Sequence, residues 1–362
     1  MEDTMNPDTT LLEDNEKLVS RFGAQRISDL KEIPDCYTFK RDMTYSHRDF
    51  DVFLDALKRG EPCAIVSGFN ASGTIHIGHR AVFDTNLYFQ REFGVRVFIP
   101  ISDDESYITG KVETQEEGLS HALALARELL AYGFDPHKTY FIIDQIYTTI
   151  YNLAIKLSRR VTVSELKATY GYKDGDNPGL YFYPTVQSAH ILLPQEQFGI
   201  KHVLVPIGPD EDSHIRICRD LAARAGYQKP SILHVRSLPG LDGTKMSKSK
   251  NNAIFLKEDE TSIRKKVQRV LSGGATTKEE HLRTGGDPDT DISCLYLSKL
   301  FLDKRDSERL FSDYRAGKIL SGEVKQLLAE HLVRFTSEFQ NKLRKITDKD
   351  LDIGILRNEV HL

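Results

Sequence analysis

The stretch Gly68-Phe69-Asn70-Ala71-Ser72-Gly73-Thr74-Ile75-His76-Ile77-Gly78-His79 follows directly after a short apolar run at residues 63–66. An apolar run of this length bounded by glycines predicts a buried parallel strand, and residues 81–91 that follow have a helical pattern. Glycines let the backbone approach a ligand closely, and the free N–H groups at a helix N-terminus bind phosphate. The stretch therefore predicts a phosphate-binding turn between a strand and a helix.

The two histidines of this stretch indicate more than a structural turn. His76 and His79 are three residues apart, so they would share one face of the first helical turn. From there both could donate hydrogen bonds to phosphate oxygens as negative charge builds in a transition state. A single histidine is more often structural, but a pair flanked by glycine after a strand favours function.

Strand and helix patterns alternate on both sides of this stretch. Further strands are predicted at residues 95–101, 140–143 and 203–207, and helices at 50–57, 114–130, 146–170 and 212–225. This alternation predicts an α/β, Rossmann-like domain with a parallel sheet over residues 46–256. Residues 1–45 are expected to form an N-terminal extension, and residues 257–362, where strand patterns stop, an all-α domain.

A second stretch, Gly243-Thr244-Lys245-Met246-Ser247-Lys248-Ser249-Lys250, carries three lysines among small residues. A solvated charged loop is the commoner fate of such a run. As ligands, however, these lysines could close over a polyphosphate and neutralise the leaving group. Neither stretch matches the Walker A pattern or the dinucleotide-binding glycine pattern, so nothing supports a kinase or a dehydrogenase.

Composition excludes several classes of protein. The 362 residues are 40% hydrophobic and 28% charged, which excludes collagen-like and wholly disordered chains. There is no apolar stretch of about 18 residues and the N-terminus is acidic, so we expect no membrane contact, no signal peptide and a cytoplasmic location. The four dispersed cysteines argue against disulfides and structural zinc. A net charge of −4 argues against bulk electrostatic binding, and we expect no DNA partner.

Together the two stretches resemble a known enzyme family. His76-Ile77-Gly78-His79 and Lys245-Met246-Ser247-Lys248-Ser249 match the HIGH and KMSKS motifs of class I aminoacyl-tRNA synthetases, about 170 residues apart. Further segments, including Ser102-Asp103-Asp104-Glu105 and Val205–Asp212, resemble the tryptophanyl-tRNA synthetases of the archaeal and eukaryotic type. The resemblance extends over about residues 17–346.

The resemblance implies a function and a set of site residues. It implies that ATP, with Mg²⁺ as its substrate complex and no tightly bound metal, activates L-tryptophan for transfer to tRNA(Trp). It implies catalytic roles for His76, His79, Lys245 and Lys248. It implies ATP binding by Ser72, Gly73, Gly78, Gly208, Asp210, Met246, Ser247 and Ser249. It implies amino-acid binding by Phe69, Ser102, Asp103, Glu105, Gln187 and Glu211. It further implies a homodimer formed through residues 105–200 and an anticodon-binding role for the helical domain.

The chain departs from the family where specificity is decided. Val66 and Pro100 stand where the eukaryotic-type enzymes have a tyrosine and a glutamine that recognise the indole. A buried indole N–H still needs an acceptor, because an unpaired buried donor costs about 1–3 kcal/mol. Asp103, Glu105 and Gln187 are the candidate acceptors.

Two alternatives remain open from the sequence. One is a tyrosyl-tRNA synthetase, whose pocket must hydrogen-bond a phenol, although the segment Asp210–His214 favours tryptophan. The other is a synthetase-derived paralogue that has lost catalysis. The intact histidines and lysines of the two motifs argue against that paralogue.

Overall fold

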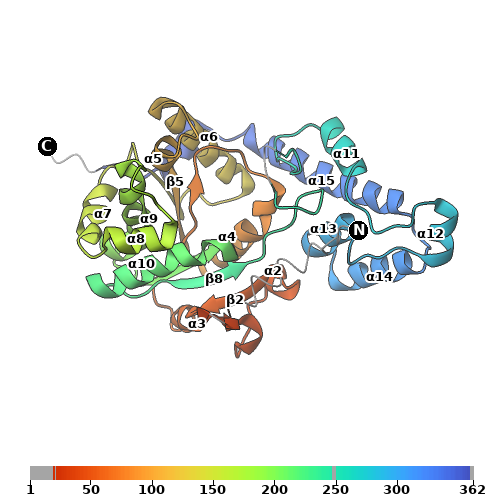
Figure 1. Ribbon diagram of the computed structural model, residues 1–362, viewed down its shortest axis with the longest axis horizontal. Helices are drawn as coiled ribbons and strands as arrows, with labels where there is room; N and C mark the ends of the chain where they lie inside the picture. Colours follow the sequence, from red (N-terminus) through yellow and green to blue (C-terminus); the bar gives the residue numbers. More distant parts are fainter. Residues whose placement is uncertain (1–18, 21, 247–249, 359–362) are drawn as a thin grey trace.

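A single mixed sheet with helices on both faces forms the larger part of the molecule (Figure 1). The computed structural model describes residues 19–20, 22–246 and 250–358. Among these residues, eight strands follow the order β1-β2-β8-β7-β3-β5-β4, with β6 paired to β5. The strands are β1 Gln25–Arg26, β2 Thr44–Arg48, β3 Cys63–Val66, β4 Phe69–Asn70, β5 Arg96–Ser102, β6 Thr139–Ile143, β7 His202–Ile207 and β8 Ser231–Val235.

Helices connect these strands and continue after the last of them. The helices of the sheet region are α2 Tyr37–Lys40, α3 Phe50–Lys58, α4 Arg80–Phe93, α5 Asp103–Ile108, α6 Gln115–Tyr132, α7 Ile150–Ser158, α8 Val163–Tyr170, α9 Pro178–Phe198 and α10 Asp212–Ala225. Those that follow are α11 Glu260–Gln268, α12 Lys278–Thr284, α13 Ile292–Tyr296, α14 Lys304–Arg315, α15 Ser321–Leu343 and α16 Asp348–Gly354, with a π-helical turn, η4, at Leu297–Phe301. Short 3₁₀ turns occupy η1 Ile27–Asp29, η2 Ile77–His79 and η3 Pro209–Glu211.

The central parallel strands are largely apolar because both faces of the sheet are covered there. In β3, Ile65 packs into the core that includes α3, α4 and α6, whereas Ala64 and Val66 pack into the core beside α7, α9 and α10. Successive side chains of a strand point to opposite faces, so a strand covered on both sides needs a continuous apolar run. The strand predicted at residues 63–66 is therefore confirmed.

The predicted fold class is confirmed, and strands that the sequence did not indicate also join the sheet. Strands β6, β5, β3 and β7 are parallel, as the alternating pattern predicted, and β8, which was not predicted, extends this parallel part. β2 pairs with β8 antiparallel, and β1 pairs with β2, so residues within the predicted N-terminal extension join the sheet. β2 has the largely polar sequence Thr-Tyr-Ser-His-Arg, although four of its five residues are buried. Its residue types therefore give no indication of a buried strand.

Helix α9 is the largest element that sequence analysis did not identify. Pro178 and Gly179 are residue types typical of a turn, and Pro184 and Pro194 lie inside the helix. Asn177 caps the helix by accepting the N–H of Leu180, and proline is favourable in a first turn because its missing N–H would have no partner there. The helix predicted at residues 146–170 is divided in two, since α7 ends at Ser158 and α8 begins at Val163.

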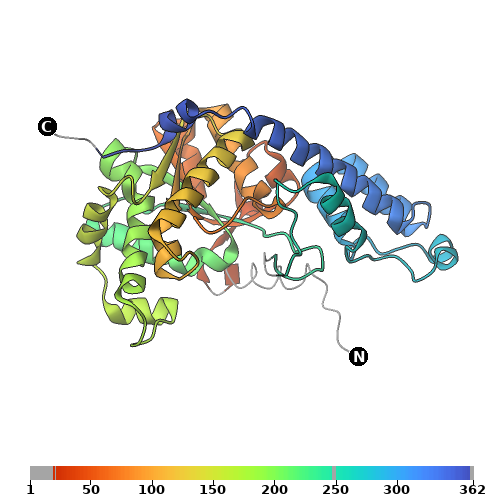
Figure 2. The same ribbon diagram turned by 90° about the horizontal axis from the view of Figure 1, so that it is seen from above.

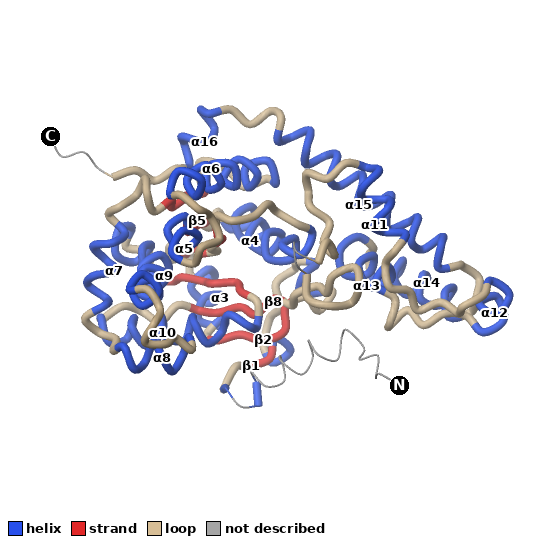
Figure 3. Tube along the Cα trace, turned by 45° about the horizontal axis from the view of Figure 1, so that its top comes forward, coloured by secondary structure: helices blue, strands red, loops and turns tan. Residues whose placement is uncertain are grey.

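The helices after β8 extend away from the sheet and then return to it. Figures 1 and 2 show α12 and α14 at the end opposite the sheet, with the long α15 running back from there. α15 packs against α6, where the rings of Phe335 and Tyr132 lie 6.0 Å apart. The chain then reaches α16, which lies above α6 in Figure 3, and Leu356 donates its N–H to Phe141 of β6 at 3.0 Å. The last described residues therefore belong to the sheet's edge.

None of the helices in the described residues is long and apolar enough to cross a membrane.

Candidate active site

A cavity of about 500 Å³ opens at the carboxyl ends of β3, β5 and β7. From β3 the chain builds β5 and β6 on one side of the sheet and then returns to build β7 and β8 on the other. The position between β3 and β7 is therefore the topological switch point, where ligands bind in open α/β sheets. Seven residues implied by the resemblance line this cavity: Phe69, His79, Ser102, Glu105, Gln187, Gly208 and Glu211.

The apolar part of the cavity is lined by aliphatic side chains, which suit the burial of an aromatic side chain. It is formed by Val66, Pro100, Ile191, Val205, Ile207 and Ile215. Val66 and Pro100, the two departures noted from the sequence, thus lie in the cavity wall. Their side chains bring no hydrogen-bonding group to it.

Helices α8, α9 and α10 and the loop after α8 contribute polar residues that were not among the predicted site residues. These are Tyr170, Tyr183, His190 and His214 on the helices and Tyr172 in the loop. The signal that could have found His190 is its spacing, because it follows Gln187 by three residues and so shares one face of α9. That signal was hidden because the helix itself was not predicted.

Two carboxylates stand at the polar part of the cavity. Glu105 accepts a hydrogen bond from Asn70 Nδ2 at 2.7 Å, and Glu211 lies 3.3 Å from His214 Nδ1. The ring of His214 stacks on Tyr170 with a centroid distance of 4.4 Å, which fixes its position. Carboxylates facing a cavity form strong charge-assisted hydrogen bonds with an ammonium group. This end therefore suits the amino group of an amino acid.

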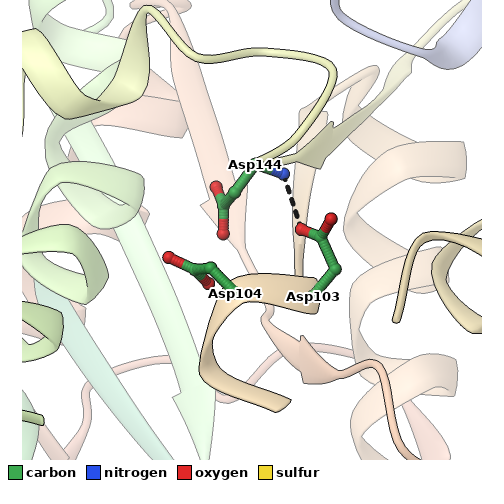
Figure 4. A group of neighbouring side chains, drawn as sticks. All are labelled: Asp103, Asp104 and Asp144. Carbon is green, nitrogen blue, oxygen red and sulfur yellow. Dashed lines mark hydrogen bonds between the residues drawn. The ribbon is translucent and has the colours of Figure 1, made fainter. Parts of the chain in front are cut away.

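Asp103 does not line the cavity, although the resemblance implied that it would bind the amino acid. It is fully buried, and it accepts the N–H of Asp144 at 2.9 Å (Figure 4). It also accepts the side-chain amide of Gln145 at 2.7 Å. Both carboxylate oxygens thus hold the chain that leaves β6. Asp103 therefore positions this segment and does not line the cavity in which a ligand would bind.

Asp103, Asp104 and Asp144 form the one group of three potential metal ligands among the described residues. The donor set does not fit a resident Mg²⁺, because both oxygens of Asp103 accept protein N–H groups. Burial, together with the proximity of the two groups, raises the pKa of Asp104, and burial also raises that of Asp144. Figure 4 shows their carboxyl groups pointing toward the same space. This arrangement indicates that they share a proton.

The paired histidines are held in one tautomer by backbone N–H groups. His76 Nδ1 accepts the N–H of Gly78 and His79 Nδ1 accepts the N–H of His76, each at 3.2 Å. Burial lowers the pKa of His76 to about 4, and burial together with the nearby His76 lowers that of His79 to about 3. Both rings are therefore neutral near pH 7, with Nδ1 as acceptor and the proton on Nε2. Each ring can donate from Nε2.

The second motif packs directly onto the first. A Cβ atom at Gly78 would lie 2.8 Å from Met246 Sδ and 2.9 Å from the ring of His76, so no larger residue fits without displacing them. Residues that follow the second motif also pair with the first. Ile77 donates its N–H to the carbonyl of Ile254 at 2.9 Å, and Leu256 donates its N–H to the carbonyl of Ile75 at 3.0 Å. These bonds fix the two motifs side by side.

Lys245 forms an ion pair with Asp210 at 3.0 Å, and both side chains are largely exposed. Gly208 permits this arrangement because a Cβ there would lie 2.6 Å from Asp210 Oδ1. Ser72 and Gly73 lie in the turn after β4, outside the cavity lining. Ser247, Lys248 and Ser249 lie outside the described residues.

Comparison with known proteins agrees with this geometry. Residues 58–337 match the family model described as tRNA synthetases class I (W and Y). The chain is 40% identical to Tryptophan--tRNA ligase 2 of Halobacterium salinarum, covering 92% of this chain and 88% of that protein. It is 35% identical to the tryptophan--tRNA ligase of Methanocaldococcus jannaschii, with 97% of each chain covered.

Solved structures give the same result for the fold. The tryptophanyl-tRNA synthetase of Aeropyrum pernix K1 superposes with a TM-score of 0.87 at 32% identity, covering 98% of this chain and 100% of that one. The enzyme of Giardia lamblia gives a TM-score of 0.87 at 29% identity, with both chains fully covered. From its motifs, its sheet topology and its full-length relatives, this chain belongs to the class I tRNA synthetase family of the tryptophan and tyrosine enzymes.

Proposed function

We propose that the protein is a tryptophan--tRNA ligase that forms tryptophanyl-adenylate from L-tryptophan and ATP and transfers the acyl group to tRNA(Trp). One observation carries this proposal: a histidine of the phosphate-binding motif lines the same cavity as the groups that suit an amino acid. His79 of the first motif lines the same cavity that has an apolar slot and two carboxylates. The relatives reported above, which match almost the whole chain, are tryptophan enzymes. They favour tryptophan over the tyrosine alternative and over an inactive paralogue.

The reaction needs alignment and charge stabilisation rather than a protein nucleophile. The carboxylate of tryptophan attacks the α-phosphorus of ATP, a P–O bond forms, and the bond to the leaving pyrophosphate breaks. The neutral imidazoles of His76 and His79 donate from Nε2 to phosphate oxygens as charge builds on them. Lys245, together with Lys248, neutralises the pyrophosphate. Mg²⁺ enters with ATP as part of the substrate and screens the phosphate charge.

The ion pair between Lys245 and Asp210 suggests the state of the second motif before ATP binds. Exposed ion pairs of this kind are worth little, at most about 1 kcal/mol, so a polyphosphate competes easily for the lysine. Gly208 lies in the cavity lining and Asp210 is two residues away, which suits contacts to the ribose and adenine. Release of Asp210 from Lys245 would free its carboxylate for the nucleoside.

We propose that α11–α16 contact the anticodon arm of the tRNA. Of the basic residues near α11, Lys266 is turned inward, where it donates to the carbonyl of Ala253 at 2.8 Å. Lys265 and Arg269 are exposed and remain for RNA contacts. Anticodon bases are read mainly by stacking and base-edge hydrogen bonds, which need only modest charge. Charging of tRNA(Trp) transcripts with altered anticodons tests this: unchanged efficiency would give the helices another role.

We also propose a homodimer formed through residues 105–200. Ile155 on α7 and Val163 on α8 are 60% and 57% exposed, which offers apolar surface in this segment. Tyr183 and Ile191 of the same segment are instead buried in the core. Light scattering at micromolar concentration should give twice the monomer mass of 41.2 kDa. A monomer mass that substrates do not change would refute the proposal.

The proposed activity is tested by exchange of labelled pyrophosphate into ATP in the presence of each of the twenty amino acids. We expect exchange that depends on tryptophan. Exchange with tyrosine alone would establish the alternative substrate, and no exchange with any amino acid would establish the inactive paralogue. Because charged tRNA is consumed at the ribosome, we place the protein in the cytoplasm.

A further inference from the structure

The apolar slot of the cavity lacks an obvious partner for the one polar group of an indole ring. Val66 and Pro100 provide only aliphatic surface there. Asp103, one of the acceptors considered from the sequence, lies outside the cavity lining with both oxygens occupied. A donor buried without a partner would weaken binding severely. Another side chain of the cavity must accept the indole N–H if tryptophan binds here.

Most polar groups of the cavity already have partners. Glu105 accepts from Asn70 and lies 3.8 Å from Lys111, and Ser102 Oγ accepts the hydroxyl of Tyr183 at 2.9 Å. Gln187 Oε1 has a long contact of 3.5 Å with the hydroxyl of Tyr170. Of these residues, Glu105 is one of the two carboxylates assigned above to the ammonium group of the substrate.

His190 differs from these residues in burial and in its bonding. It lines the cavity from α9 and is only 2% exposed. Its Nε2 lies 2.7 Å from Asp144 Oδ1, which is also fully buried. Within the described part of the chain, no hydrogen bond to its second nitrogen, Nδ1, is found. One nitrogen is therefore fixed by the protein and the other remains for a ligand.

The surroundings of Asp144 determine which nitrogen carries the proton. Asp144 Oδ2 is buried and has no hydrogen-bond partner among the described residues. A proton on Asp104 supplies a donor to that oxygen. Burial raises the pKa of both carboxyl groups, and the hydrogen bond between them adds to the rise at Asp104 but offsets part of it at Asp144. The hydroxyl of Tyr151 donates a hydrogen bond to Asp104 Oδ2 at 3.2 Å, which helps to fix the position of Asp104. Asp144 is thus the ionised member of the pair.

An ionised Asp144 needs a donor, so the proton of His190 lies on Nε2. Burial lowers the pKa of His190 to about 4, and the ring carries a single proton near pH 7. Nδ1 is then an acceptor, since the tautomer of a histidine is set by the bond that its other nitrogen makes. Buried carboxylates fix the tautomers of catalytic and metal-binding histidines in the same way.

We propose that His190 is a specificity-determining residue whose Nδ1 accepts the indole N–H of bound tryptophan, with Asp104 and Asp144 holding the ring in the accepting tautomer. This inference rests on the proposed function, because it names the group that reads the side chain of the substrate. It also explains how a pocket with Val66 and Pro100 can retain tryptophan. The aliphatic wall holds the flat ring and His190 recognises its one donor.

The test compares tryptophan with β-(3-benzothienyl)alanine, in which sulfur replaces the N–H of the indole. The amino-acid-dependent pyrophosphate exchange of wild type and His190→Leu is measured with both. Loss of one buried hydrogen bond should lower kcat/KM for tryptophan about 10- to 100-fold in His190→Leu. The value for the analogue, which has no N–H to lose, should change less than about 3-fold. An equal loss for both substrates, or none, would overturn the proposal.

Two variants separate recognition from damage to the fold. His234 is a matched control, because it is fully buried and its Nε2 lies 3.0 Å from Asp212 Oδ1, but it does not line the cavity. His234→Leu should leave the ratio of the two substrates as in wild type. His190→Asn, whose Oδ1 stands near the position of Nδ1, should restore most of the preference for tryptophan. Failure of that restoration would contradict the acceptor role.

Binding can be followed without turnover because the chain contains no tryptophan. Fluorescence of bound tryptophan, excited beyond the tyrosine band, therefore reports the ligand alone. His190→Leu should weaken this binding by the same factor as kcat/KM, whereas unchanged affinity would overturn the inference. If wild type bound and activated no tryptophan, the proposed function itself would fail. The two failures are thus distinguishable.

Discussion

Replacement of His76 by asparagine isolates the hydrogen bond that we assign to its Nε2. Asparagine Oδ1 stands near the position of His76 Nδ1, so it can still accept the N–H of Gly78 that Nδ1 accepts at 3.2 Å. It has no donor that reaches as far as Nε2. The stability of the fold should therefore fall by no more than about 1 kcal/mol, while one donor to the developing phosphate charge is lost.

Loss of such a donor typically costs about 10²- to 10³-fold in rate, or about 3–4 kcal/mol. We expect this decrease in the single-turnover rate of adenylate formation by His76→Asn, measured by quenched flow. Affinity for tryptophan should stay within about 2-fold, because His76 acts on phosphate. His76→Gln, whose amide extends toward the position of Nε2, should recover part of the rate. His281→Asn, a buried histidine of α12, serves as the control.

The pH dependence gives a second check on the same residue. Because burial lowers the pKa of His76 to about 4, the donating ring is neutral, and its contribution should not change between about pH 6 and pH 8. A loss of rate as pH rises through about 6.5 would show that an imidazolium is the donor. Full activity of His76→Asn at all pH values would refute the assigned role altogether.

The remaining predictions concern the lysine motif, its packing and the sheet. Lys245→Ala should slow adenylate formation by about 10-fold or more with stability unchanged, because its pair with Asp210 is exposed, and a wild-type rate would contradict its role. Gly78→Ala should reduce the rate by displacing Met246, and normal kinetics would show that the two motifs need not touch. Asp212→Asn should lower the free energy of unfolding in urea by about 3–5 kcal/mol, because it breaks a buried pair with Arg48 at 2.8 Å. Burial alone would raise the pKa of Asp212, but hydrogen bonds from His234 and Arg48 hold it below its ordinary value. This stabilisation should be present above about pH 4 and be lost as pH falls, and a wild-type pH profile of unfolding in the variant would contradict it.

The parallel core of the fold could be predicted because its strands are buried on both faces. Cys63–Val66 and His202–Ile207 are apolar runs with little else in them, and such runs are a local signal. β2 could not be predicted, because the residues of β2 are mostly polar and the strand that it pairs with, β8, lies far along the chain. In β2, Ser46 bonds to His234 at 2.9 Å, so polar side chains are satisfied inside the sheet by tertiary contacts that no local pattern reveals.

The candidate site divides in the same way. The residues of the two motifs could be predicted because phosphate chemistry demands glycine, histidine and lysine in a short stretch. The position of Asp103 could not be predicted, because only the tertiary structure shows that Gln145 and the backbone of Asp144 occupy its oxygens. His190 was missed because the helix that carries it, α9, was not predicted. The prolines of α9 argue against a helix when only the sequence is considered.

The most direct measurement of the central claim is the transfer of labelled tryptophan to a tRNA(Trp) transcript by the purified full-length chain. With ATP and Mg²⁺ present, we expect label on the terminal adenosine at close to one tryptophan per tRNA, with labelled tyrosine giving no charging under the same conditions. Charging with tyrosine, or adenylate formation that never leads to charged tRNA, would contradict the account.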